Sequence, residues 1–168
     1  MKNVYIVGFM GTGKTSVGKI LANKLSKEFV EMDEAVEQEA GKKIKDIFAK
    51  EGEGYFRKLE SNLLQRLSSQ SDLVVSCGGG IVCNEDNLKI LKNSGYVFAL
   101  DASAVSIYAR IKDSSQRPLL NVENPLEKIK QLLQARESFY ARAGKKIKTD
   151  NLSAEEVADC ILKLLKNG

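Results

Sequence analysis

Residues 4–16, VYIVGFMGTGKTS, decide the fold, because a short apolar run enters the pattern Gly8-x-x-x-x-Gly13-Lys14-Thr15 and a helical pattern leaves it. Glycines let successive backbone N–H groups turn inward around phosphate oxygens, and the helix that follows adds its positive N-terminal end. In this pattern Lys14 reaches the β- and γ-phosphates of a nucleotide, and Thr15 holds Mg²⁺. The stretch therefore predicts a phosphate-binding loop, with an ordinary glycine turn as the alternative.

Length and composition favour one globular α/β domain covering residues 1–168. The chain is 43% hydrophobic and 29% charged, which is ordinary for a soluble protein. Its net charge is +4, but Lys and Arg are dispersed along the sequence, so we expect no nucleic acid partner. We expect neither a signal peptide nor a membrane span, because no apolar run is long enough. A cytoplasmic monomer is the expectation.

Cysteine and histidine usage narrows the possible chemistry. Cys77, Cys83 and Cys160 are odd in number and lack C-x-x-C spacing, so free thiols are expected rather than disulfides or a zinc site. The chain contains no His, which excludes His-based triads, His metal ligands and a His general base. Proton handling must therefore fall to Asp, Glu, Lys or Tyr.

Strands and helices alternate along the chain. Strands are expected at residues 3–7, 29–32, 73–77, 96–100 and 147–150. The helices between them begin at recognisable caps, which are Asn84, Ser103, Asn124-Pro125 and the capping box formed by Ser153 and Glu156. Strands separated by helices predict a five-stranded parallel sheet with helices on both faces, a three-layer α/β/α arrangement.

Ligands of such sheets bind beyond the carboxyl ends of the strands, where three features of this chain are expected to meet. The phosphate loop follows the first strand, Glu31 and Asp33 end the second, and Gly78–Gly80 follow the third. A carboxylate here could orient or deprotonate an attacking hydroxyl, although Asp33 could instead cap a helix. The glycines allow backbone to approach a ligand closely, with a loose turn as the alternative.

Taken together, the motifs resemble those of the shikimate kinases, which are of the nucleoside-monophosphate-kinase structural type. The matching residues, in chain order, are GFMGTGKTS at 8–16, Asp33, Ile47-Phe48, Gly52-Glu53, Phe56-Arg57, Glu60, Gly78–Gly80, Arg117-Pro118-Leu119-Leu120, and Arg136 with Tyr140. Each motif alone is modest, but the set in this order and spacing is specific and covers essentially the whole chain.

The resemblance implies a P-loop NTPase fold and transfer of the ATP γ-phosphoryl group to the 3-hydroxyl of shikimate, within aromatic amino acid biosynthesis. It implies a substrate-binding helical segment at about 33–60 and a mobile lid at about 112–124. On the nucleotide side, the residues implied to bind ATP are Gly11, Thr12, Gly13, Lys14, Thr15, Ser16, Arg110 and Arg117. Lys14, Arg117 and Asp33 would be the catalytic residues.

On the acceptor side, the resemblance implies that Asp33 binds the reacting hydroxyl and that Gly79 and Gly80 donate backbone N–H groups. Arg57 and Arg136 would clamp the shikimate carboxylate, since a planar guanidinium binds a carboxylate through two parallel hydrogen bonds. The resemblance also implies that Glu60 helps to hold Arg57 in place. Arg57 could instead form a surface helix pair with Glu60, and Arg136 could extend from its apolar helix face to solvent.

Arg117 lies in the proline-containing loop, where lid closure would bring its charge to the transferring phosphoryl group; a solvated loop arginine is the alternative. Arg110 is similar to an arginine that packs against adenine in relatives. The chain departs from the family at Glu31-Met32-Asp33, where Asp-x-Asp is common. Glu31 is therefore expected to contact Mg²⁺ through a water molecule, leaving Thr15 as the direct protein ligand.

Two other functions stay open at this point. A related small-molecule kinase, acting on gluconate or a nucleoside monophosphate, would share the phosphate loop but would differ at Phe56-Arg57, Glu60 and the glycine triplet. A nucleotide-dependent switch or silent binder belongs to another class. Its GTPase form would carry an Asn-Lys-x-Asp motif, which this chain lacks. Nucleotide turnover that depends on a small-molecule acceptor separates these possibilities.

Overall fold

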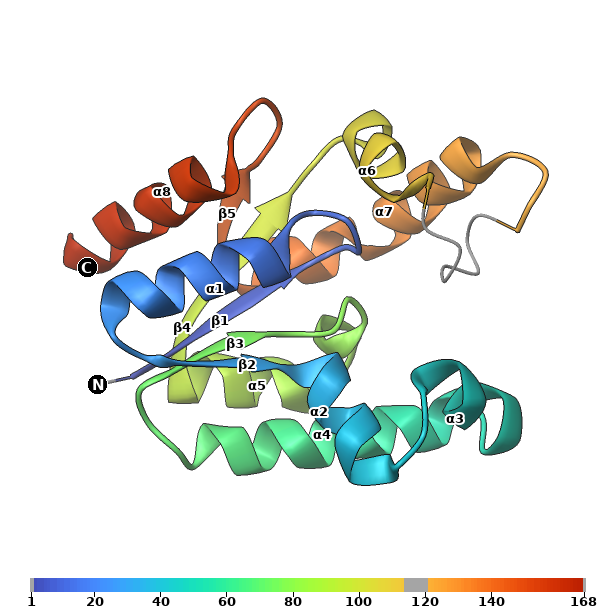
Figure 1. Ribbon diagram of the computed structural model, residues 1–168, viewed down its shortest axis with the longest axis horizontal. Coiled ribbons are helices and arrows are strands. Elements are labelled where there is room, and N and C mark those ends of the chain that lie inside the picture. The colour runs from blue at the N-terminus through green and yellow to red at the C-terminus, as the bar shows by residue number, and fades with distance from the viewer. Residues whose placement is uncertain (1, 114–120, 168) are drawn as a thin grey trace.

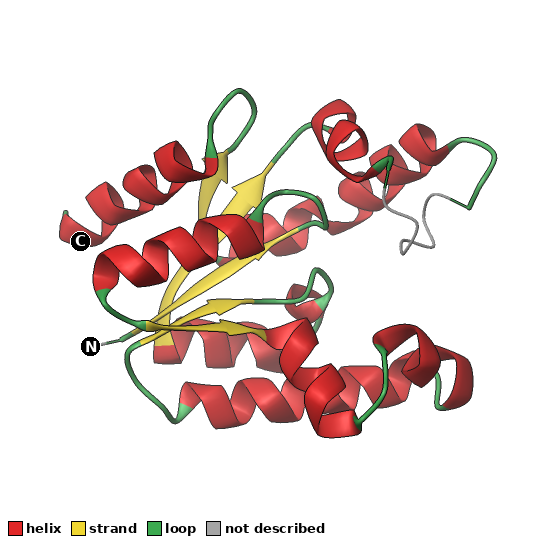
Figure 2. Ribbon diagram, in the orientation of Figure 1, coloured by secondary structure: helices red, strands yellow, loops and turns green. Residues whose placement is uncertain are grey.

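The computed structural model describes residues 2–113 and 121–167. In this part of the chain, five strands form one sheet in the order β2-β3-β1-β4-β5 with every pairing parallel (Figures 1 and 2). The strands are β1 (Asn3–Gly8), β2 (Glu28–Glu31), β3 (Leu73–Ser76), β4 (Gly95–Asp101) and β5 (Lys145–Lys148). The helices are α1 (Lys14–Leu25), α2 (Met32–Ala40), α3 (Ile44–Lys50), α4 (Glu53–Ser68), the 3₁₀ turn η1 (Ile81–Cys83), α5 (Glu85–Ser94), α6 (Ala104–Ile111), α7 (Pro125–Ala143) and α8 (Ala154–Lys166).

Helices cover both faces of the sheet, as the alternation of strands and helices predicts. α1 and α8 pack together on one face, over a core that includes Val4, Ile6 and Leu21. α4, α5 and α7 cover the other face, over a core that includes Tyr5 and Leu64. All of β1 is buried, because helices lie on both of its sides, and this explains its continuous apolar run. The predicted α/β/α fold class is confirmed.

The helix starts also follow the sequence signals. The side chains of Asn84, Ser103 and Asn124 accept hydrogen bonds from the first-turn N–H groups of α5, α6 and α7. Ser153 and Glu156 form both hydrogen bonds of the predicted capping box at α8. These side chains satisfy backbone donors that a helix leaves without a partner at its start.

Most expected strands differ from the observed ones by one residue at an end, and the differences at β5 and β2 have clear causes. The last strand was expected at residues 147–150, but β5 is Lys145–Lys148, because its partner β4 ends at Asp101, which pairs with Lys148. The second strand was expected to include Met32, yet α2 begins there. Glu31 is the residue before that helix, so Asp33 lies inside the first turn and is not its cap.

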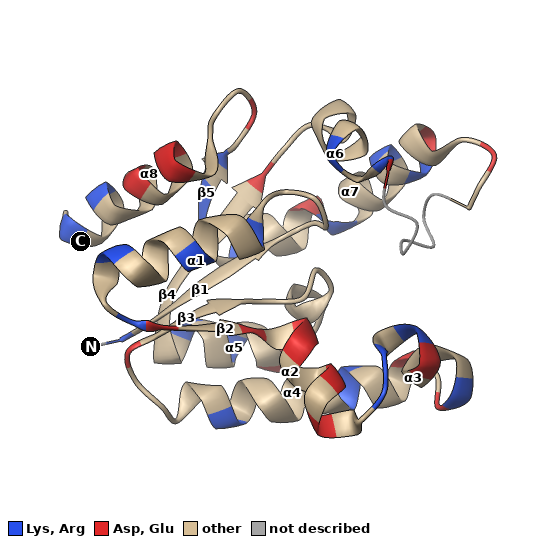
Figure 3. Ribbon diagram, in the orientation of Figure 1, with Lys and Arg blue, Asp and Glu red and all other residues tan. Residues whose placement is uncertain are grey.

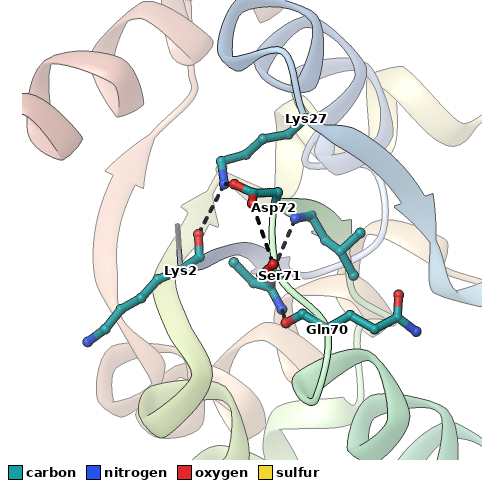
Figure 4. Close-up of polar contacts among 7 residues, drawn as sticks. Lys2, Lys27, Gln70, Ser71 and Asp72 are labelled. Atoms are coloured by element: carbon teal, nitrogen blue, oxygen red, sulfur yellow. Dashed lines mark hydrogen bonds and ion pairs between the residues drawn. The ribbon is translucent and has the colours of Figure 1, made fainter.

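The amino ends of the central strands are fastened by polar contacts. Buried Asn3 donates to the carbonyls of Leu67 and Gln70 and accepts from the N–H of Leu73. Beside it, the ammonium group of Lys27 donates to the carbonyl of Lys2 at 3.2 Å and to Asp72 at 2.8 Å (Figure 4). These contacts join β1 to the segment between α4 and β3 at the end of the sheet opposite the phosphate loop.

The three cysteines are free, as predicted, with Cys77 buried and Cys83 exposed. Within the described ranges, no helix combines the length and the apolar character needed to cross a membrane. The carboxyl ends of the five strands all face one edge, and the loops after β1 and β3 meet there (Figure 1).

Candidate active site

The loop between β1 and α1 has the shape that its glycines predict. Gly11 and Gly13 have φ angles of 75° and 95°, in the left-handed region that side chains rarely adopt. A Cβ on Gly11 would also lie 2.8 Å from Cγ2 of Ile111, so α6 packs directly on the loop. Thr12 is buried, and its hydroxyl donates to the carbonyl of Phe9 at 2.7 Å. The sequence thus forms a tight backbone turn at the start of a helix.

Lys14 extends back along this loop from the first residue of α1. Its ammonium group donates to the carbonyls of Gly8 and Phe9 at 2.9 and 3.0 Å. The positive charge is therefore held beside the loop backbone, together with the N-terminal end of α1. This arrangement provides a site for phosphate groups.

Thr15 and Glu31 meet at the end of β2. The Thr15 hydroxyl donates to Oε2 of Glu31 at 2.6 Å. Burial raises the pKa of Glu31, and the hydrogen bond from Thr15 partly offsets this effect. Hydroxyl and carboxylate oxygens are the donors that Mg²⁺ prefers. Among the described residues, no group of three or more His, Cys, Asp or Glu could hold a metal, so a Mg²⁺ ion here would depend on phosphate and water oxygens as well.

Arg57 and Glu60 lie three residues apart on α4, within the segment predicted to bind the substrate. Arg57 donates to Glu60 at 2.9 Å, and Glu60 is only 1% exposed. The outward side of the guanidinium also contacts exposed Glu53 at 3.3 Å. The alternative of a plain surface pair with Glu60 does not hold, because Glu60 is buried and restrains one side of the guanidinium.

The glycine triplet packs directly against these side chains. A Cβ on Gly80 would lie 2.5 Å from both Nη atoms of Arg57. A Cβ on Gly78 would lie 3.1 Å from Oδ1 of Asp33 and would also overlap Oε1 of Glu60. Side chains at these positions would displace the charged groups, so the triplet is more than a loose turn.

Two carboxylates therefore lie near each other beside Gly78. Asp33 is half-buried in the first turn of α2, and Glu60 is buried in α4. Burial raises the pKa of Glu60; the charge of Arg57 lowers it, and the charge of Asp33 raises it further. Among the described residues, Oε1 of Glu60 has no hydrogen-bond partner. Asp33 is the more accessible of the two, which suits contact with a small hydroxylated ligand.

Arg136 reaches the same region from α7. Its guanidinium lies over the ring of Phe9, with Cζ 5.7 Å from the ring centroid. A Cβ on Gly79 would lie 3.7 Å from Nη1 of Arg136. Arg136 is only half-buried and contacts the glycine turn, so it does not simply extend to solvent. Arg57 and Arg136, far apart in sequence, thus lie against the two adjacent glycines.

Three predicted residues on the nucleotide side remain, and the structure describes two of them. Arg110 on α6 donates to the carbonyl of Gly11 at 3.1 Å, which places it beside the phosphate loop. Ser16 is exposed in the first turn of α1. Arg117 and most of the expected lid lie outside the described residues, so their roles stay predictions.

Tyr140 was named with Arg136 among the motif residues but was given no role, and Phe9 was not singled out; both lie beside the residues described above. Tyr140 is buried, and its hydroxyl donates to the carbonyl of Gly79 at 2.6 Å. It lies four residues after Arg136 on the same helix, a spacing that puts both side chains on one face. That spacing is the signal that could have suggested a role for Tyr140 beside Arg136. Phe9, inside the phosphate loop, gave no comparable signal.

Comparison with known proteins points to one family. Residues 10–166 match the family model described as shikimate kinase. The shikimate kinase of Thermodesulfovibrio yellowstonii is 47% identical over 97% of this chain and 94% of its own. The solved shikimate kinase of Acinetobacter baumannii in complex with shikimate has a TM-score of 0.94 and 38% identity, covering 99% of this chain and 94% of its own. A gluconokinase from Sinorhizobium meliloti, at 16% identity and a TM-score of 0.60 over 99% of this chain and 94% of its own, shares the fold alone.

Proposed function

The chain belongs to the shikimate kinase family and is an ATP-dependent kinase that phosphorylates shikimate, and from this premise we propose which residues carry out the reaction. One observation carries the proposal. The phosphate loop and the acceptor side meet at Gly79, where a Cβ would lie 3.5 Å from the carbonyl oxygen of Gly8 and 3.7 Å from Arg136. ATP bound at the phosphate loop and shikimate held through its carboxylate would therefore be neighbours.

On the nucleotide side, backbone N–H groups of the loop, from Gly11 to Ser16, bind the phosphates of ATP. Lys14 stabilises the charge on the transferring phosphoryl group, and Arg110 lies on the side of the loop where the rest of the nucleotide would extend. Phosphoryl transfer depends mainly on positioning and charge stabilisation, which fixed backbone donors and cations provide. The contacts of Lys14 and Arg110 with the loop backbone support these roles.

Mg²⁺ is the metal that the donor atoms fit. Thr15 would hold the ion directly, and Glu31 would hold a water molecule bound to it. The 2.6 Å hydrogen bond between these residues supports the pairing, because it places two oxygen donors at the mouth of the phosphate loop. When bound, the ion neutralises phosphate charge.

On the acceptor side, Arg57 and Arg136 bind the shikimate carboxylate, and the backbone of Gly79 and Gly80 donates to substrate oxygens. Asp33 accepts a hydrogen bond from the 3-hydroxyl and orients or deprotonates it. The hydroxyl oxygen then forms a bond to the γ-phosphorus as the bond from that phosphorus to ADP breaks. Burial of Glu60 behind Arg57 supports the clamp, since a buried carboxylate holds one side of the guanidinium fixed.

A role for Arg117 is proposed on the basis of the sequence alone. It would approach the transferring phosphoryl group when segment 112–124 closes over the ligands, which also keeps water away from the reaction. Arg117→Ala should therefore lower kcat more than it weakens shikimate binding.

We also propose that the enzyme works as a cytoplasmic monomer of one domain, without nucleic acid or membrane partners. Figure 3 shows Lys and Arg positions spread along the ribbon among Asp and Glu positions. Light scattering during size-exclusion chromatography tests the monomer, and cell fractionation tests the location.

The experiment that tests the proposed function is ADP production from Mg²⁺–ATP with and without shikimate, using quinate and gluconate as comparison acceptors. We expect turnover with shikimate and little with the other two. Arg136→Ala should raise the KM for shikimate at least about tenfold, the cost of losing charged hydrogen bonds, while ATP binding persists. Unchanged shikimate affinity in this variant would contradict the clamp, and absence of shikimate-dependent turnover in the wild type would contradict the function.

A further inference from the structure

Tyr140 joins α7 to the glycine turn through one hydrogen bond, from its hydroxyl to the carbonyl of Gly79 at 2.6 Å. We propose that Tyr140 is a positioning residue, which holds the Gly79–Gly80 peptide in the orientation that presents the N–H of Gly80 to the acceptor. The inference rests on the role proposed above for that N–H group. Tyr140 itself does not touch the reacting atoms.

The peptide bond between Gly79 and Gly80 is planar, so the directions of its two polar groups are coupled. In a trans peptide, the C=O of one residue and the N–H of the next point in opposite directions. The described part of the chain contains no cis peptide bond. A hydrogen bond that fixes the carbonyl of Gly79 toward Tyr140 therefore fixes the N–H of Gly80 away from Tyr140.

The glycines make this restraint necessary. Gly79 and Gly80 have no side chains to limit rotation of the peptide between them, so an unrestrained turn could rotate its donor out of place. A Cβ on Gly79 would lie 3.7 Å from both the Tyr140 hydroxyl and Nη1 of Arg136. The same face of α7 thus contributes a cation for the ligand and a donor that orients the neighbouring backbone.

The protonation state of Tyr140 suits a permanent donor. Burial raises the pKa of Tyr140 to about 12, although the nearby charge of Arg136 lowers it. The phenol is therefore neutral between pH 6 and pH 9 and keeps its proton for the carbonyl of Gly79. A phenolate could not donate this hydrogen bond.

The ring and the hydroxyl of Tyr140 have separable tasks. The ring is part of the hydrophobic core on this face and lines a cavity of about 270 Å³ together with Phe9 and Leu133. Phenylalanine keeps the ring and removes only the hydroxyl group. Tyr140→Phe therefore removes the hydroxyl's hydrogen bond to Gly79, together with its contact to Arg136, while it leaves the packing in place.

The test compares Tyr140→Phe with Tyr5→Phe. Tyr5 is also buried, and its hydroxyl shares a 2.8 Å hydrogen bond with Ser94 at the amino end of the sheet. Tyr140→Phe should raise the KM for shikimate about tenfold, as expected for one lost buried hydrogen bond, with kcat and the KM for ATP within about twofold of wild type. Tyr5→Phe should lower Tm and leave both KM values unchanged. The KM ratio of Tyr140→Phe to wild type should stay constant from pH 6 to pH 9.

Three outcomes would overturn the inference. The first is an unchanged KM for shikimate in Tyr140→Phe while Arg136→Ala loses shikimate affinity, a result that leaves the proposed function intact. The second is that Tyr140→Phe lowers Tm and kcat and raises both KM values in parallel, which marks a purely structural role. The third is a KM ratio that changes with pH. Absence of shikimate-dependent turnover in the wild type would instead remove the proposed function, and this inference with it.

Discussion

The hydroxyl of Thr15 lies 2.6 Å from the carboxylate of Glu31 and joins the first turn of α1 to the residue that precedes α2. Through this contact, the helix that follows the phosphate loop is linked to the segment that carries Asp33. A substitution at the end of β2 would therefore be expected to alter the binding of a metal ion beside Thr15.

Glu31→Gln should raise the Mg²⁺ concentration needed for half-maximal activity about tenfold, because residues that orient metal-bound water typically contribute 10- to 100-fold to metal affinity. Glu31→Asp should remain within about threefold of wild type, since it keeps the charge. Mg²⁺ titrations of ADP production measure both. Glu28→Gln, at the exposed start of β2, is the control. Equal Mg²⁺ dependence in Glu31→Gln and wild type would show that Glu31 does not serve the metal.

Asp33→Asn should lose about 10²- to 10⁴-fold in kcat, the usual contribution of an acid–base group, and should bind ATP as the wild type does. Calorimetric titration with a nonhydrolysable ATP analogue and steady-state kinetics separate the two effects. Glu34→Gln, on the exposed side of the same helical turn, should behave as wild type. Near-normal kcat in Asp33→Asn would remove Asp33 from the mechanism.

Gly80→Ala and Gly79→Ala should differ, although the glycines are adjacent. A Cβ at residue 80 would lie 2.5 Å from the Arg57 guanidinium and push it from its place, so the KM for shikimate should rise about tenfold or more. A Cβ at residue 79 would make ordinary contacts of 3.5–3.7 Å, and its effect should stay within about threefold. If both variants matched wild type, the guanidinium of Arg57 would not need its observed position.

Glu60→Gln should change how stability depends on pH. Burial raises the pKa of Glu60 in the folded protein above its ordinary value of 4.5. Between those two values, the folded protein holds a proton that the unfolded chain has lost, so stability falls as pH rises through this window. The glutamine variant has no proton to lose. Its free energy of unfolding, relative to wild type, should therefore increase between pH 4 and pH 7.

Urea unfolding at several pH values measures this difference. Glu53→Gln is the matched control, because Glu53 also contacts Arg57 but its side chain is 66% exposed. A pH-independent difference between Glu60→Gln and wild type would mean that the Glu60 carboxylate carries no net cost of burial. Glu60→Gln should also raise the KM for shikimate, since Arg57 loses its buried charged partner.

The sequence predicted much of the fold because its signals are local. Apolar runs flanked by helices gave the strands, and the caps at Asn84, Ser103 and Ser153 gave helix starts within a residue. The end of β5 could not be read this way, because it depends on where β4 stops, a pairing between distant segments. Met32 was assigned to a strand because a short, mostly apolar stretch such as Phe29–Met32 fits either a strand or a buried helix start.

The site divides in the same way. The glycine pattern and Lys14 could be predicted, since a phosphate loop is contiguous in sequence. That Gly78 leaves room for the carboxylates of Asp33 and Glu60, or that Gly79 accepts from Tyr140, depends on contacts between residues many positions apart. The resemblance to a family supplied roles for several of these residues, but it did not predict the contacts that hold them in place.

The hydrogen bonds of Asn3 and Lys27 lie at one end of β1, and the phosphate loop begins at the other end. Six strand residues separate the two ends by about 20 Å. A substitution at the amino end can therefore change these polar contacts at a distance from the phosphate loop. Protein engineers could strengthen the amino end for heat tolerance, and laboratory evolution could alter acceptor choice at the other, with little interference between the two.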